Sequence, residues 1–243
     1  MEIKRIINFS GGLSSALMTI LEYNKKTDLV IFADTGREHP KTYKFISDFE
    51  KNENIPVMKL QYKNEYGEGF TALYQKKKTM LPNRQFRTCT VELKINPVTK
   101  YCRQTLKLKK FDWIVGFRYD EEKRVKNYSC QKYKNPLFPL YEKKIRLEDV
   151  NKYWSNKCYT LEIPRILGNC DLCFLKGKNN LIKIMQHYPE LAQKWIDDEK
   201  RNGKTFIKDI SYSQLLEISK KQGQLFELNN LESAYPNCKC SIN

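Results

Sequence analysis

The sequence is poor in histidine and in acidic side chains, and it contains no long apolar run. Its only histidines are His39 and His187, which excludes a histidine-rich metal site and leaves little scope for acid–base catalysis by histidine. No stretch reaches the roughly 18 apolar residues that a membrane-spanning helix needs, and no apolar segment of signal type opens the sequence. We therefore expect a soluble, cytoplasmic protein without a membrane partner, whose chemistry uses Cys, Asp, Glu, Lys and Arg.

The charge balance is strongly basic. The 243 residues include 44 Lys and Arg against 28 Asp and Glu, which gives a formal net charge of +16. Such an excess favours a polyanionic partner, because basic surfaces steer phosphates and release counterions on binding them. We expect contact with nucleic acid, either tRNA or DNA, and part of the charge would serve a nucleoside triphosphate. A merely lysine-rich surface is the alternative, and a homodimer is left open.

Eight cysteines are present. Without an export signal they indicate metal or redox chemistry rather than a disulfide framework. Cys170 and Cys173 have the spacing that lets two thiolates bind one metal, and Cys238 and Cys240 can supply two more. Four thiolates suit Zn²⁺ or a [4Fe-4S] cluster equally, and four unliganded thiols are the alternative. The cysteines without visible partners are expected to be structural: Cys102, Cys130 and Cys158.

The order of apolar and amphipathic stretches predicts an α/β fold with a doubly wound, mostly parallel sheet. Strands are expected at residues 3–9, 29–33, 57–60 and 111–116, and helices at 15–23, 41–50, 94–106, 146–154, 179–201 and 213–220. Residues 61–88 are expected to form a mobile basic excursion over the site, and residues 125–147 to be mostly loop. We predict a nucleotide-binding domain over residues 1–150 and a small helical module, pinned by cysteines, over residues 151–243.

The segment Ser10-Gly11-Gly12-Leu13-Ser14-Ser15 lies between an apolar strand and a helix-like stretch. A strand that turns through paired glycines into a helix presents free backbone N–H groups and the positive end of the helix dipole to one point. The glycines allow close approach, and the serines can add hydroxyl donors or cap the helix. The segment is therefore a candidate phosphate cradle, although Gly and Ser also occur in such turns for local geometry alone.

Two further strands end in polar residues that should reach the same edge of the sheet. Residues 29–33 lead into Asp34-Thr35-Gly36-Arg37-Glu38, and residues 111–116 lead into Phe117 and Arg118. In an open parallel sheet, ligands bind beyond the carboxyl ends of the strands. Asp34 could hold Mg²⁺ or a ribose, or it could simply cap its turn.

Together these motifs resemble the phosphoadenosine phosphosulfate (PAPS) reductase-like branch of the PP-loop ATP pyrophosphatase superfamily, with its Rossmann-like HUP-type fold. The resemblance spans nearly the whole chain, and it is greatest to the small phage and bacterial members of that branch. The residues that carry it are Ser10 to Ser15, Phe32 to Glu38, Arg87-Thr88-Cys89-Thr90, Lys94 with Pro97, Gly116 to Glu121 with Arg124, Gly168 to Phe174, and Cys238-Lys239-Cys240.

The resemblance implies ATP, PAPS or adenylylsulfate as the bound nucleotide, with Mg²⁺. The residues expected to bind it are Ser10, Gly11, Gly12, Ser14, Ser15, Asp34, Thr35, Gly36, Arg87, Lys94, Gly116, Arg118 and Arg124. The arginines would each bind two phosphate oxygens in a bidentate manner. The expected catalytic residues are Arg118, Lys94, Asp34 and Cys89, of which Cys89 could equally be a metal ligand, a sulfur carrier or a small buried side chain.

The family chemistry implies attack on the α-phosphate of ATP, release of pyrophosphate and replacement of the adenylated oxygen by sulfur. We expect sulfur transfer to a nucleic acid or nucleotide, because the chain ends in Asn237-Cys238-Lys239-Cys240 and lacks the Glu-Cys-Gly-x-His segment of sulfonucleotide reductases. A sulfonucleotide reductase is the first alternative. A catalytically silent nucleotide-binding or nucleic-acid-binding module is the second, because Leu13 and Ser14 replace the Lys or Arg and the Asp of some relatives.

Overall fold

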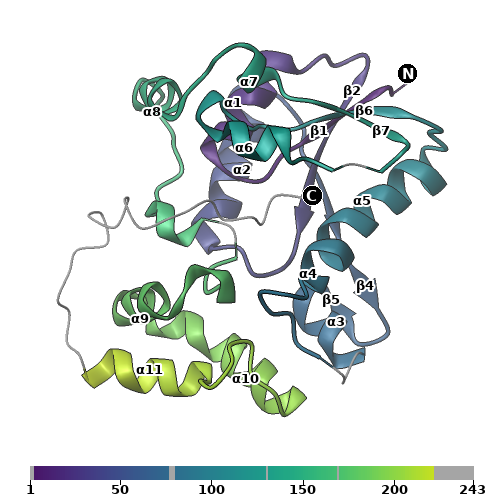
Figure 1. Ribbon diagram of the computed structural model, residues 1–243. Coiled ribbons are helices and arrows are strands. Elements are labelled where there is room, and N and C mark those ends of the chain that lie inside the picture. Colours follow the sequence, from purple (N-terminus) through teal and green to yellow (C-terminus); the bar gives the residue numbers. More distant parts are fainter. Residues whose placement is uncertain (1–2, 77–79, 130, 169, 222–243) are drawn as a thin grey trace.

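A parallel sheet organises the first two thirds of the protein. The computed structural model describes residues 3–76, 80–129, 131–168 and 170–221 (Figure 1). Five strands form the sheet in the order β3-β2-β1-β6-β7, and every neighbouring pair is parallel. Their bounds are β1 Arg5–Asn8, β2 Asp28–Asp34, β3 Met58–Gln61, β6 Phe111–Ile114 and β7 Lys134–Leu137. The α/β prediction is confirmed.

Helices follow each inner strand. A short hairpin, β4 Lys63–Asn64 and β5 Gly67–Glu68, precedes the third helix. The α-helices are α1 Leu13–Glu22, α2 Pro40–Glu53, α3 Gly69–Lys76, α4 Thr88–Thr90, α5 Asn96–Lys100, α6 Glu122–Lys126, α7 Pro139–Glu142, α8 Leu147–Ser155, α9 Lys178–His187, α10 Ala192–Asn202 and α11 Tyr212–Lys221. The π-helical segments are η1 Val91–Ile95 and η2 Tyr101–Thr105, and the 3-10 turns are η3 Tyr119–Glu121, η4 Arg165–Leu167, η5 Phe174–Lys176 and η6 Pro189–Leu191.

The sheet is covered on both faces at its inner strands β1, β2 and β6, whose apolar residues are buried. Alternate residues of β1 separate onto the two sides. Ile7 packs in one cluster with α1, α2 and α8, represented by Phe45 and Trp154. Ile6 packs in the other cluster with Val98 of α5. This double covering directs the loops that follow the strands to a single edge.

A third hydrophobic cluster forms the core of the helical module, where α9, α10 and α11 lie together (Figure 1). The ring of Trp195 stacks on Tyr212 with centroids 5.3 Å apart and also packs against Phe70 of α3 at 5.3 Å. The expected excursion over residues 61–88 therefore contains a hairpin and a helix, and that helix is part of this core rather than a loop over the site.

Two prolines explain most of the differences from the predicted elements. The expected loop at 125–147 contains β7, whose Pro136 is tolerated because β7 is an edge strand of the sheet. The single helix expected at 179–201 is broken into α9 and α10 at Pro189, which cannot continue the hydrogen-bond ladder. The helix expected at 94–106 begins earlier, at Thr88, and runs through η1 and η2 to Thr105.

Some predictions fall outside the described residues. Cys130, Cys238 and Cys240 do so, and the cysteine pinning of the helical module stays a prediction, as does the division at residue 150. Across the part of the chain that the structure describes, no helix combines the length and the apolar character that crossing a bilayer requires.

Candidate functional site

The strand order creates one switch point. The chain winds outward from β1 through β2 to β3 on one side, then returns to place β6 and β7 on the other side of β1. The connections that follow β1 and β6 therefore run towards opposite edges of the sheet, and open α/β sheets bind ligands at such a point. The glycine-serine segment follows β1, and Gly116 and Arg118 follow β6.

Backbone donors at the start of α1 face this switch point. Gly12 is the N-cap of α1 in an extended conformation, and no side chain caps the helix. The first N–H groups of a helix have no partner within it, so those of Leu13 and Ser14 are available to an anion. Gly11 makes the turn possible with φ +76°, and a Cβ there would lie 2.7 Å from Thr42 Cγ2.

Ser15 stabilises this turn from inside. Its Oγ accepts from the Ser10 N–H at 3.1 Å and from Ser10 Oγ at 2.9 Å, and it donates to the carbonyl oxygen of Gly12 at 2.9 Å. Ser15 is also buried, whereas Ser10 is exposed and Ser14 half-buried. Of the predicted phosphate ligands, Ser15 is thus committed to loop geometry, and Ser14 presents its hydroxyl to the loop after β6.

Arg118 connects the two loops. Its Nη1 donates to Ser14 Oγ at 3.1 Å, while Nε and Nη2 bind the Asp120 carboxylate at 3.1 and 2.9 Å. Glu121 lies 3.3 Å from Nη1 and also forms an ion pair with Arg124. The Arg118 side chain is only 9% exposed, so these contacts fix its orientation. Arg118 thus lies beside the start of α1, and its role as a clamp on phosphate oxygens stays a prediction.

Close packing holds the same two loops together at Gly116. A Cβ at Gly116 would lie 3.2 Å from the Cα of Ser15 and 3.5 Å from Met18 Sδ. Only glycine allows the end of β6 to approach the first turn of α1 this closely. Arg124 joins this network through Glu121. It forms an ion pair with that carboxylate, and its guanidinium lies over the ring of Phe117, 4.2 Å from the centroid.

The loop after β2 is organised by a carboxylate that sequence reasoning did not select. Glu38 is buried and accepts from the Thr35 hydroxyl at 2.8 Å, the Thr35 N–H at 3.2 Å and the Arg37 N–H at 3.3 Å. The Tyr43 hydroxyl donates to Asp34 Oδ1 at 2.7 Å and to Glu38 at 3.3 Å. The sequence signal that could have identified Glu38 is a carboxylate that closely follows the turn Asp34-Thr35-Gly36.

Lys94 supplies positive charge to this loop. Burial raises the pKa of the Glu38 carboxyl, and the positive charge of Lys94 opposes that rise. η1, which carries Lys94, packs against β2. Asp34 is also held in place, because its Oδ1 accepts from the Gly36 N–H at 2.8 Å, where Gly36 adopts φ +74°. Asp34, Thr35, Gly36 and Lys94 thus belong to one region.

The Cys170–Cys173 turn docks on this loop. Cys170 pairs with Glu38 in an isolated antiparallel bridge, and the Asp171 N–H donates to the carbonyl oxygen of Arg37 at 2.9 Å. Cys170 Sγ lies 3.6 Å from Thr35 Oγ1, although 135 residues separate them in sequence. The turn therefore joins the helical module to the edge of the sheet at the expected nucleotide site.

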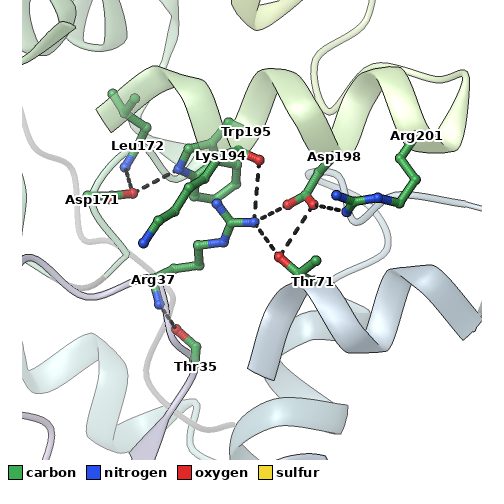
Figure 2. A network of polar contacts seen from close by, with 9 residues as sticks. All are labelled: Thr35, Arg37, Thr71, Asp171, Leu172, Lys194, Trp195, Asp198 and Arg201. Carbon is green, nitrogen blue, oxygen red and sulfur yellow. Dashed lines mark hydrogen bonds and ion pairs between the residues drawn. The ribbon is translucent and has the colours of Figure 1, made fainter. Parts of the chain in front are cut away.

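Figure 2 shows how Arg37 reaches from the same loop into the helical module. Its guanidinium forms a buried ion pair with Asp198 of α10 and donates to Thr71 Oγ1 at 2.9 Å. It also lies over the rings of Phe70 and Trp195, 5.1 and 5.2 Å from their centroids. Sequence patterns gave no sign of this burial, because arginine is usually a surface residue.

The Arg87–Thr90 segment lies beside the helical core. Cys89 borders the same hydrophobic cluster as Cys170 and Cys173, and Arg87 Nη2 donates to Thr90 Oγ1 at 3.3 Å. Among the described residues, no three His, Cys, Asp or Glu side chains are arranged to hold a metal ion. The cysteines expected to complete the metal site, Cys238 and Cys240, lie outside those residues, and the metal site stays a prediction.

Comparison with known proteins agrees with this arrangement. The family model of the phosphoadenosine phosphosulfate reductase domain matches residues 4–159, which include the switch point, the loop after β2 and Arg118. The match confirms the family resemblance of the motifs. The Cys170–Cys173 turn lies beyond the matched residues.

Relatives come from a phage and an archaeon. The chain is 31% identical over 200 residues to the uncharacterized nin region protein ORF290 of Escherichia phage lambda, covering 72% of this chain and 67% of that protein. It is 29% identical over 217 residues to the uncharacterized protein MJ0973 of Methanocaldococcus jannaschii, covering 81% of this chain and 47% of the relative. It is 27% identical over 205 residues to the uncharacterized protein MJ0066 of the same archaeon, covering 78% of this chain and 40% of the relative. This chain thus spans less than half of either archaeal protein.

Proposed function

The chain belongs to the phosphoadenosine phosphosulfate reductase domain family, and from this premise we propose that it cleaves ATP at the α-phosphate to support sulfur transfer to a nucleic acid or nucleotide. Family membership implies nucleotide binding. The observation that carries the proposal is the uncapped start of α1 at the switch point, with Arg118 hydrogen-bonded to Ser14 beside it. This arrangement suits a polyphosphate, because unpaired N–H groups and the helix dipole both favour negative charge.

In the proposed reaction, a carbonyl-like oxygen of the acceptor attacks the α-phosphorus and the bond to the α,β-bridging oxygen breaks. Pyrophosphate leaves, and AMP stays on the acceptor. A sulfur nucleophile then bonds to the acceptor carbon, and AMP departs with the oxygen. Charge accumulates on the leaving pyrophosphate, so fixed donors at the start of α1 would contribute most of the rate enhancement. Mg²⁺, if bound, would neutralise part of that charge.

The residues after β2 would hold the nucleoside. Asp34 is pre-oriented by Tyr43 and the Gly36 N–H, as a ribose hydroxyl or a metal would require. Lys94 would place positive charge near the phosphates, and Arg87 would add a second cation from the start of α4. These roles follow from the family motifs and from the grouping of Asp34 and Lys94 around Glu38.

Product analysis with ATP labelled at the α-phosphate tests the proposal. We expect labelled AMP together with pyrophosphate, and we expect Arg118→Gln to reduce the rate at least tenfold because the donor set is incomplete. Lys44→Gln removes an exposed cation on α2 that pairs with Asp48, and it should leave the rate unchanged. Labelled ADP, or no product, would contradict α-phosphate cleavage.

Sulfonucleotide reduction is the second candidate, favoured by the family match and by the position of Cys170 Sγ, 3.6 Å from the Thr35 hydroxyl. A thiolate near the nucleotide edge could attack the sulfur of PAPS or adenylylsulfate. Supplying these nucleotides with a thiol reductant distinguishes the two activities, because only a reductase releases sulfite and the nucleotide. The same preparation should be inactive toward them if it transfers sulfur by way of ATP.

A further inference from the structure

A tight turn at residues 83–87, directly before α4, presents an aromatic ring to solvent. We propose that this turn is a docking platform for single-stranded nucleic acid, with one unpaired base stacked on Phe86. The inference rests on the proposed function, since it identifies how a nucleic-acid acceptor would be held. It goes further by naming a surface that is separate from the switch point.

Exposed large apolar side chains concentrate around this turn. The structure exposes five among its described residues: Leu21, Tyr66, Met80, Phe86 and Val91. Four of the five fall between residues 66 and 91, and Phe86 is 53% exposed. Phe86 thus lies within a stretch of the sequence where exposed apolar side chains are frequent, and such side chains are common at interaction surfaces.

The backbone of the turn holds Phe86 outward. Asn83 Oδ1 accepts from the N–H groups of Gln85 at 2.9 Å and Phe86 at 3.0 Å, and the Asn83 N–H donates to the carbonyl oxygen of Phe86 at 3.1 Å. An asparagine side chain that closes its own turn in this way fixes the backbone locally. The Phe86 ring is therefore displayed by an ordered turn, which lowers the entropy cost of stacking a base on it.

Charge selects a polyanion as the occupant. The turn itself, residues 83–87, contains two arginines and no Asp or Glu. Arg84 and Arg87 flank the ring in sequence, and Arg84 is exposed. Its Nη2 extends toward the start of α9, 3.7 Å from where a Cβ on Gly177 would lie. An exposed aromatic ring between arginines matches the way single strands are bound, with bases on π-faces and phosphates on cations.

The turn is placed to deliver an acceptor to the nucleotide. It leads directly into α4 and η1, and the charge of Lys94 on η1 acts on Glu38 in the loop after β2. The hydroxyls of Thr88 and Tyr74 lie 2.8 Å apart and fix the start of α4 on α3. Figure 1 shows α3, α4 and the β4–β5 hairpin grouped on one side, below α5.

Fluorescence anisotropy with a labelled single-stranded oligonucleotide, as RNA and as DNA, tests the inference on the full chain. We expect Phe86→Ala to weaken binding about tenfold and Phe86→Trp to retain it, with quenching of the new indole on titration. Leu21→Ala is the matched control, because Leu21 is 46% exposed on α1, outside the surface. It should bind as tightly as the unaltered chain.

Two results would overturn the inference. One is equal binding by the Phe86→Ala and unaltered chains, and the other is no binding of any single strand by the unaltered chain. A Phe86→Ala chain that loses self-association but keeps oligonucleotide affinity would assign the surface to a second copy, which also contradicts it. Thermal stabilisation of the chain by ATP, measured separately without oligonucleotide, reports on nucleotide binding at the start of α1, so the two can fail independently.

Discussion

At the scale of single residues, the site depends on charged side chains that are buried and paired. Arg37, Glu38 and Arg118 are each less than 10% exposed, and each is held by several hydrogen bonds. Burying a charge is costly unless partners replace water, so these contacts need to be complete. Removing one partner should therefore cost far more than removing an exposed charge.

Arg37→Met tests the buried pair that joins the loop after β2 to α10. The variant leaves Asp198 buried without its main partner, so we expect the free energy of unfolding to fall by about 3–5 kcal/mol. Urea denaturation measures it. Lys44→Met is the matched control, because the Lys44–Asp48 pair is exposed and should contribute at most about 0.5 kcal/mol.

A double variant separates pairing from packing. Arg37→Met combined with Asp198→Leu removes both buried charges, and it should recover much of the lost stability. If the double variant is as unstable as the sum of the two single variants, then the contact between Arg37 and Asp198 does not explain the effect.

Asp120 gives a pH dependence with a definite sign. Burial pushes its pKa up, but the hydrogen bonds and charge of Arg118 and the N–H of Leu147 hold the pKa below the ordinary value. A depressed pKa contributes stability that is complete above about pH 4 and is lost as pH falls through the folded-state pKa. Asp120 is partly exposed, so we expect a contribution of about 1 kcal/mol.

Urea denaturation of Asp120→Asn between pH 3 and pH 7 measures this contribution. The variant should be less stable than the unaltered chain at pH 7, and this difference should shrink toward pH 3. Asp48→Asn, which removes the exposed partner of Lys44, serves as the control. A difference that stays constant across the range would show that Asp120 acts without changing its protonation.

At the scale of secondary-structure elements, the first turn of α1 is positioned by glycine. Gly11 and Gly67 both have positive φ, at 76° and 120°, but their surroundings differ. A Cβ at Gly11 would lie 2.7 Å from Thr42 Cγ2 on α2, whereas a Cβ at Gly67 would meet nothing within 4 Å. A substitution at Gly67 would therefore introduce backbone strain alone, whereas a substitution at Gly11 would also introduce a clash with α2.

Alanine at each position tests this difference by thermal denaturation with and without ATP. We expect Gly67→Ala to lose about 1 kcal/mol from strain and to keep the stabilisation by ATP. Gly11→Ala should lose a further 1–3 kcal/mol, roughly, from overpacking, and should lose the stabilisation by ATP. Equal stabilisation of both variants by ATP would place the nucleotide elsewhere.

The central sheet could be predicted from the sequence because its signals are local. The inner strands β1, β2 and β6 are rich in buried apolar residues, and the glycine-serine segment adjoins β1 in sequence. The β7 strand was missed because Pro136 argues against a strand unless its edge position is known. The packing of α3 was missed because its core partners, such as Trp195, are distant in sequence.

The candidate site divides in the same way. The glycine-serine segment could be predicted as a turn, but the docking of Cys170 on Thr35 could not, because no local pattern specifies a contact across 135 residues. The pairing of Arg37 with Asp198 spans 161 residues and uses residue types that are ordinarily exposed. Spacing alone therefore identified the cysteines as a pair but not their position beside the nucleotide loop.

At the scale of the whole molecule, the helical module and the sheet are joined at the nucleotide edge. Arg37, Asp171 and Cys170 make this junction, and all three contact the loop after β2 or belong to it. The net charge of +16 is compatible with the phosphate-bearing acceptor that we propose.

The most direct test of the central claim is a crystal structure of the chain with a nonhydrolysable ATP analogue that carries a methylene group between the α- and β-phosphates. We predict electron density for the phosphates within hydrogen-bonding distance of the Leu13 and Ser14 N–H groups at the start of α1, with Arg118 beside them. Phosphate density at any other part of the protein, with the start of α1 left to water, would contradict the account.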